Sequence, residues 1–167
     1  RTYPVWVVVP VFIGLYIVLA GVLGECCRWL LLPAGVLTGD EPGLVASCVY
    51  SACDVLAVLA ASLLLFRLEG RPWSELGLSV RGHGRGWLYG FLLAAVFYGI
   101  GFGLSLVLGE VKVTGVHWQP GRLAGAWLFF LLVALFEEIL VRGFILGRLL
   151  RSGMNRFLAL FLSASLF

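Results

Sequence analysis

The stretch Phe136-Glu137-Glu138-Ile139-Leu140-Val141-Arg142-Gly143-Phe144 decides how this chain is interpreted. Fourteen uncharged residues, Leu123 to Phe136, lead into it, so two carboxylates and a guanidinium stand inside one apolar segment of helix length. Each such group costs about 2.5–3.5 kcal/mol on scales of membrane insertion. We therefore expect these groups to face the interior of a helix bundle, where they either perform chemistry or hold helices together.

The composition of the whole chain agrees with a membrane environment. Of its 167 residues 61% are hydrophobic and 13% are charged, and the mean hydropathy is +1.03. Soluble domains carry about 25% charged residues. The composition therefore predicts an all-α, polytopic helical membrane bundle with the lipid bilayer as its surroundings. The basic residues stand in short loops and form no patch interleaved with aromatic residues, so we expect no nucleic-acid partner.

The apolar runs set the number of membrane spans, because a helix needs about 20 residues to cross a bilayer. They predict about four complete transmembrane helices and the start of a fifth, at Val5–Leu23, Leu44–Phe66, Trp87–Leu108, Leu123–Gly147 and Phe157–Phe167. A basic loop, Arg148 to Arg156, is expected between the last two. We interpret residues 1–167 as a single membrane domain that is incomplete at its C-terminus, since the chain ends inside the fifth run.

The basic residues also predict an orientation. With the N-terminus in the cytoplasm, the inner segments hold eight basic residues and the outer loops hold three, which are Arg28, Lys112 and Arg122. Cytoplasmic loops are enriched in Lys and Arg. A chain rich in Gly, Arg and Trp and poor in Lys also points to a GC-rich bacterium. We therefore expect the bacterial cytoplasmic membrane, with a cytoplasmic N-terminus.

Asp54 stands in the middle of the second predicted span. One interpretation is a structural carboxylate that is hydrogen-bonded to a neighbouring helix. The other is a functional or relay group, because acids inside a membrane often mark functional sites.

The spacing within the opening stretch separates the roles of its two glutamates. Glu138 and Arg142 are four residues apart, so they share a helix face and can form an ion pair. Glu137 points about 100° away and has no cation one turn along. A carboxylate that is left free in an apolar pocket can act as a general base. Physical reasoning alone leaves three interpretations open: a packing network, a charge relay in a transporter, or catalysis.

The pattern Glu137-Glu138-Ile-Leu-Val-Arg142-Gly143 resembles the EExxxR motif of the CPBP family, the CAAX-type and bacteriocin-processing proteases that are Rce1-like glutamate intramembrane proteases. An Arg-rich turn and another apolar helix follow, as in that family. Phe167 is the candidate Phe of the second family motif, FxxxH, whose His would fall beyond the end of the chain. The resemblance covers residues 122–167. Trp73-Ser-Glu-Leu-Gly-Leu is also similar to segments that precede the motif in relatives.

The resemblance implies a catalytic mechanism. Glu137 would activate water as the general base, and Glu138 and Arg142 would shape the site and orient a peptide or protein substrate at the membrane. A His motif beyond Phe167, followed by a third motif HxxxN or HxxxD, would complete the site. We therefore expect this polypeptide alone to be inactive.

We expect neither a metal nor another cofactor. Some relatives have been described as metalloproteases, but His83 and His117 are the only two histidines, and neither belongs to an HExxH helix. A catalytic zinc ion normally has three protein ligands. The resemblance thus favours water activated by a glutamate.

Two hypotheses follow. The leading one is an intramembrane endopeptidase of the CAAX-protease type that hydrolyses peptide bonds of membrane-associated substrates. The alternative is a non-proteolytic membrane protein, either a proton-coupled carrier or an immunity-type protein, which uses Asp54, Glu137 and Arg142 as a relay or a packing network. A truncated gene product without activity is a third option. Under the leading hypothesis Arg142→Ala leaves Glu138 buried and unpaired, a change that costs about 3–5 kcal/mol.

Overall fold

The computed structural model describes residues 3–33, 35, 43–76, 84–115 and 117–165. Every regular element among these residues is a helix, which confirms the predicted all-α class. Three of the described helices contain stretches that are long and apolar enough to cross a membrane. These are α1 (Val5–Leu31), α2 (Leu44–Glu69) and α3 (Gly84–Val107). The chain is an integral membrane protein.

The chain divides into two units. Unit 1 comprises residues 1–78 and 120–167, and unit 2 comprises residues 79–119 with α3. The stretch from Phe136 to Phe144 lies in unit 1.

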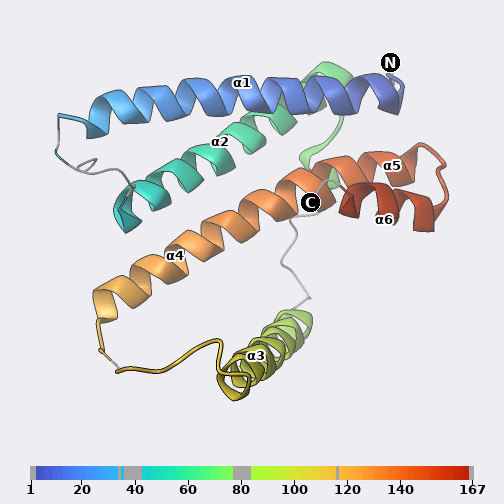
Figure 1. Ribbon diagram of the computed structural model, residues 1–167. Coiled ribbons are helices and arrows are strands. Elements are labelled where there is room, and N and C mark those ends of the chain that lie inside the picture. The colour runs from blue at the N-terminus through green and yellow to red at the C-terminus, as the bar shows by residue number, and fades with distance from the viewer. Residues whose placement is uncertain (1–2, 34, 36–42, 77–83, 116, 166–167) are drawn as a thin grey trace. The chain divides into compact units, whose positions relative to one another are not determined.

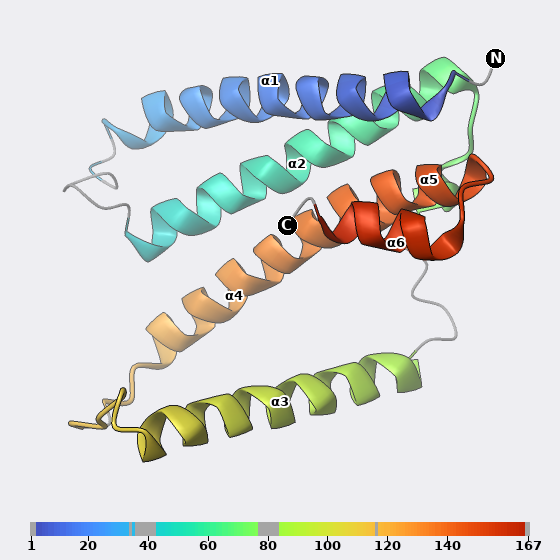
Figure 2. The same cartoon turned by 45° about the vertical axis from the view of Figure 1, so that its right-hand side comes forward.

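In unit 1, α1 and α2 pack side by side and run in opposite directions (Figures 1 and 2). A continuous helical rod then follows the direction of α2. It consists of α4 (Pro120–Glu137), the π-helix η2 (Glu138–Leu146) and α5 (Gly147–Arg151). After a turn, α6 (Arg156–Ala164) folds back against η2 and α5. The short 3₁₀ helix η1 (Trp73–Leu76) also packs on η2.

The ends of these helices follow from local chemistry. The last turn of α2 is closed by Gly70, whose φ of 67° is a left-handed conformation that glycine adopts without strain. Pro120 begins α4, where its missing N–H costs no hydrogen bond. The side chain of Asn155 accepts a hydrogen bond of 2.9 Å from the backbone N–H of Phe157 and so caps α6.

Three phenylalanines form the centre of the core. The rings of Phe12 and Phe144 stack with their centroids 3.7 Å apart, and the centroids of Phe66 and Phe144 are 5.6 Å apart. All three side chains are fully buried. Because they come from α1, α2 and η2, this one cluster joins the helix pair to the segment that carries the two glutamates.

The beginning of α4 lies against the beginning of α2. A Cβ added at Gly125 would come within 2.6 Å of the Leu44 side chain, and the Cys48 thiol donates to the Gly125 carbonyl over 3.5 Å. Small residues allow helices in membranes to approach this closely. Gly125 therefore marks a contact that holds one end of the rod to α2.

The other end of the rod is held by charge. Arg148 of α5 donates to Glu69, the last residue of α2, and their side chains are only 4% and 2% exposed. Arg71 lies 3.5 Å from the same carboxylate. The Arg148 guanidinium also lies over the rings of Phe66 and Phe144, 5.5 and 5.2 Å from their centroids. Such stacking favours a partly desolvated cation.

A second charge cluster surrounds the first. Glu75 of η1 accepts from Arg71 over 3.1 Å and from Arg151 of α5. The predicted loop from Arg148 to Arg156 was therefore wrong in its first half. The helix continues to Arg151 because Arg148 finds a buried carboxylate and two aromatic faces, which a solvated loop would not offer.

We predict that Phe144→Ala destabilises the protein by about 3–5 kcal/mol, because it removes a ring that packs against two others in a closed core. The measurement is the free energy of unfolding in mixed micelles. Phe130→Ala is the matched control, since Phe130 is 67% exposed on α4. An equal loss for both variants would contradict the central position of Phe144.

Candidate active site

The helix changes its winding between the two glutamates. Glu137 is the last residue of α4, and Glu138 is the first of a nine-residue π-helix that ends at Leu146. In a π-helix each N–H bonds to the carbonyl five residues back, and such segments are rare and frequently lie at functional sites. The motif therefore occupies an unusual stretch of backbone.

The predicted ion pair is present. Arg142 Nη1 donates to both carboxylate oxygens of Glu138, each over 3.0 Å. One guanidinium nitrogen thus contacts both carboxylate oxygens and offsets the Glu138 charge. The remaining N–H groups of Arg142 stay available for another acceptor.

Glu137 differs from its neighbour. Among the described residues it has no hydrogen-bond or ion-pair partner, and its side chain is exposed on unit 1. Its backbone still has the α-helical φ and ψ of −60° and −44°. The two adjacent carboxylates therefore show the predicted asymmetry, one held by a cation and the other free to contact water or a ligand.

The direction of the charged face differs from the sequence-based expectation. Glu138 and Arg142 were expected inside the bundle, but their side chains are 52% and 71% exposed on unit 1. The physical reason is that the opposite face of η2 supplies the core of the unit. That buried face consists of Ile139, Val141, Gly143, Phe144 and Ile145. Charged groups on the same helix consequently point outward from unit 1.

Gly143 packs closely on η1. A Cβ added there would lie 3.1 Å from the Leu76 carbonyl oxygen and 3.3 Å from its Cδ2 atom. Leu76 itself is buried, with 3% of its surface exposed. The glycine of the motif therefore lets the backbone of η2 touch the segment that contains Trp73 and Glu75.

Asp54 contacts a neighbouring helix. The Tyr16 hydroxyl of α1 donates to Asp54 Oδ1 over 3.3 Å, so the acid is hydrogen-bonded to a neighbouring helix. The Tyr16 ring in turn lies 5.3 Å from that of Phe136, the residue before Glu137. In the described part of the chain no hydrogen bond or ion pair joins Asp54 to Glu137 or Arg142.

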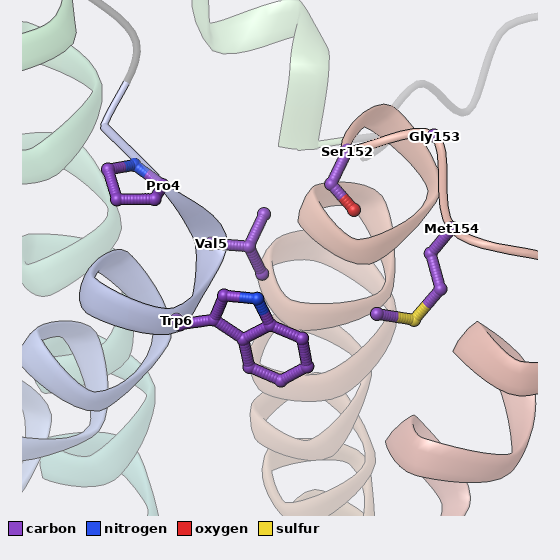
Figure 3. A pocket seen from close by; sticks show the side chains of 6 residues that line it. All are labelled: Pro4, Val5, Trp6, Ser152, Gly153 and Met154. Atoms are coloured by element: carbon purple, nitrogen blue, oxygen red, sulfur yellow. The ribbon is translucent and has the colours of Figure 1, made fainter.

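A cavity of about 450 Å³ lies elsewhere in unit 1, between the start of α1 and the turn after α5 (Figure 3). Its lining contains no ionisable side chain and consists of Pro4, Val5, Trp6, Ser152, Gly153 and Met154. This cavity does not include the motif, so it is not the catalytic site that the sequence predicts.

The remaining site predictions concern histidines and the second motif. His117 is exposed in unit 2, while His83 and Phe167 lie outside the described residues. Across the described ranges no group of three His, Cys, Asp or Glu side chains is placed to hold a metal ion. Sequence reasoning also missed the cluster around Glu69 and Glu75. The signal that could have found it is the coincidence of a Glu at the end of one apolar run with an Arg at the end of another.

We predict that Arg142→Ala lowers the free energy of unfolding by at most about 1 kcal/mol, because exposed ion pairs contribute about 0.2–1 kcal/mol. This value replaces the larger loss that a buried pair would imply. Expression level and thermal stability in micelles test it, with Arg28→Ala as the control for the exposed Glu25–Arg28 pair. A stability loss far above that of the control would show that the pair is buried in the protein.

Gly143→Ala is expected to disturb η2, because the new methyl group meets a backbone carbonyl that cannot rotate away. Overpacking of this kind costs about 1–3 kcal/mol. Gly21→Ala in α1 is the matched control, since no atom lies within 4 Å of its added Cβ. Thermal stability of the two variants decides the point, and equal values would mean that η1 does not pack on Gly143.

Residues 117–167 match the protein family described as type II CAAX prenyl endopeptidase Rce1-like. No curated protein and no solved structure matches the chain significantly. The matched segment contains α4, η2, α5 and α6, with the paired and the free glutamate. The motif-bearing part of the chain therefore matches the Rce1-like family of membrane endopeptidases, as the resemblance predicted.

Proposed function

We propose that this protein functions as an intramembrane endopeptidase of the CAAX-protease type, with Glu137 as the general base. The observation that carries the proposal is the asymmetry of the motif. Glu137 is exposed and without a partner among the described residues, while Glu138 beside it is neutralised by Arg142. The family match of the same segment supports peptide-bond hydrolysis over other uses of such a pair.

The proposed reaction begins with a water molecule bound to Glu137. The carboxylate takes a proton from this water while the water oxygen attacks the carbonyl carbon of the scissile peptide bond. The tetrahedral intermediate then collapses, the C–N bond breaks, and the proton held by Glu137 moves to the leaving nitrogen. The N–H groups of Arg142 that do not contact Glu138 would bind a carbonyl or carboxylate oxygen of the substrate. By the resemblance, a histidine motif completes the stabilisation of the oxyanion.

The substrate of this reaction would be a peptide or protein segment at the membrane. Charged side chains in membrane helices almost always face a protein interior or a water-filled cavity, because lipid does not solvate them. The outward face of Glu137, Glu138 and Arg142 on unit 1 thus suits a polar, water-containing space that a substrate backbone can enter.

The proposed location is the bacterial cytoplasmic membrane, with the N-terminus in the cytoplasm. The structure brings the C-terminal end of α2 and the end of α5 together through Glu69, Arg71 and Arg148. The beginning of α1 lies at the same end of unit 1, next to the turn after α5 (Figure 3). This common end agrees with the topology in which the Arg-rich segments share one side.

We predict that Glu137→Gln in the full-length protein abolishes hydrolysis and leaves the fold intact. The amide cannot accept the proton of the attacking water, and loss of general-base catalysis costs about 10²–10⁴-fold in rate. The assay follows a quenched fluorescent peptide with a lipid anchor in vesicles of phosphatidylethanolamine and phosphatidylglycerol.

Glu25→Gln is the control, since it also removes one exposed carboxylate from a membrane helix. Undiminished cleavage by Glu137→Gln would rule out Glu137 as the base. That result would favour the non-proteolytic alternative, in which the same residues function in a carrier or an immunity-type protein.

A further inference from the structure

We propose that Glu69 and Glu75 are positioning residues, which set the winding of the motif segment and thereby the placement of Glu137 and Glu138. Its catalytic consequence rests on the proposed function, whereas its structural part stands on the contacts of unit 1 alone. The residues concerned stand before the motif in the sequence, at the end of α2 and in η1.

Contacts with α2 hold both ends of the rod. At one end, Gly125 of α4 touches Leu44 and Cys48 of α2. At the other end, Arg148 of α5 is bound by Glu69 of α2. Both anchors of the rod therefore stand on the same helix, which runs alongside it in the same direction (Figures 1 and 2).

The winding of residues 138–146 sets the rotation of α5 about the rod axis. An α-helix advances one turn in 3.6 residues, whereas a π-helix bonds five residues apart and has wider turns. If residues 138–146 wound as an α-helix, α5 would be rotated relative to α4. The Arg148 and Arg151 side chains would then point away from Glu69 and Glu75. The two carboxylates consequently select the wide winding.

The buried contact of Glu69 and the contacts of Glu75 both restrain the motif segment. Glu69 and Arg148 are 2% and 4% exposed, so neither charge can exchange its partner for water without moving a helix. Glu75 binds Arg151 and Arg71 and thus holds η1 against α5. This places Leu76 on Gly143, where an added Cβ would lie only 3.1 Å from the Leu76 carbonyl oxygen. The winding is thereby held from the end of the rod and from its side.

The consequence is a division of labour between two faces of the rod. On the inner face of the rod, Phe144, Arg148 and Arg151 contact α2 and η1. These contacts fix the rotation of α5 about the rod axis. On the outer face, the same winding determines how Glu137 is placed relative to the Glu138–Arg142 pair. Glu69 and Glu75 touch no reacting atom, so they act through the backbone of η2.

The test uses three variants of the full-length protein in lipid nanodiscs. Glu69→Gln removes the buried charge and keeps the shape of the side chain. Glu75→Arg reverses the charge of the more exposed partner, and Glu75→Arg with Arg151→Glu and Arg71→Gln restores an ion pair with the charges exchanged and removes the like charge at position 71. Glu25→Gln is the matched control, because its pair with Arg28 spans 3.1 Å at the opposite end of α1.

Hydrogen exchange of the backbone amides of residues 138–146 is the first readout. We expect exchange about tenfold faster in Glu69→Gln and in Glu75→Arg, because the local opening of η2 becomes easier. The charge-exchanged variant and the control should stay within about twofold of the unmodified protein. A rise that is equal in η2, α1 and α2 would mean general destabilisation only and would overturn the proposal. So would the absence of a rise.

Peptide hydrolysis by the same proteins is the second readout. A misplaced catalytic group can cost about 10²-fold in rate, so kcat should fall at least tenfold in both single variants, with KM nearly unchanged. The charge-exchanged variant should recover kcat, which a purely structural defect would not explain. If Glu137→Gln cleaves normally, the proposed function fails, and hydrogen exchange alone still decides whether Glu69 and Glu75 set the winding.

Discussion

The buried ion pair of Glu69 and Arg148 is the interaction on which the rest of unit 1 depends. Desolvation of two charges costs several kcal/mol per ion, and only good geometry with further partners offsets it. Here Arg71 approaches the same carboxylate, and two aromatic faces cover the guanidinium. Glu69 Oε1 and Arg148 Nε nevertheless have no hydrogen-bond partner among the described residues. These atoms lower the net stability that the pair contributes, whereas removal of either residue would leave the other charge buried and unpaired.

The arrangement of this pair explains how the motif is presented. Glu69 ends α2 and Arg148 stands in α5, so their ion pair joins α2 to one end of the rod. The contact at Gly125 joins α2 to the other end, and α2 and the rod thus form a closed frame. Phe144 fills the space inside the frame against Phe12 and Phe66. Because the apolar face of η2 packs in this core, Glu137, Glu138 and Arg142 lie exposed on the outer face of unit 1. The site is thus a consequence of how the core is packed.

Some of this structure could be predicted from sequence because the physics is local. Runs of about 20 apolar residues identify membrane helices whatever their neighbours are. The spacing of Glu138 and Arg142 allows an ion pair in both an α-helix and a π-helix, so that prediction did not depend on the winding. The hydrogen bond of Asp54 to a neighbouring helix follows from the need to satisfy a polar group in an apolar span.

Other features depend on tertiary packing and could not be predicted. Residues 138–146 look like any apolar helix, because the contacts that favour wide winding come from α2 and η1. Glu138 and Arg142 mark one face of the segment, and the cost of charges in lipid predicted that this face points into the bundle. The charged face is instead exposed on unit 1, because the apolar face packs against α1, α2 and η1. Arg148 was placed in a loop because its partner, Glu69, is far away in the sequence.

The most direct test of this account is a double-mutant cycle on the buried pair. Glu69→Gln, Arg148→Met and the double variant are unfolded in mixed micelles, and the coupling free energy is taken from the four stabilities. If the pair closes the frame, the two substitutions should be strongly non-additive, with a coupling of about 1–3 kcal/mol. Additive effects, within about 0.5 kcal/mol, would show that the two residues do not depend on each other and would contradict the account.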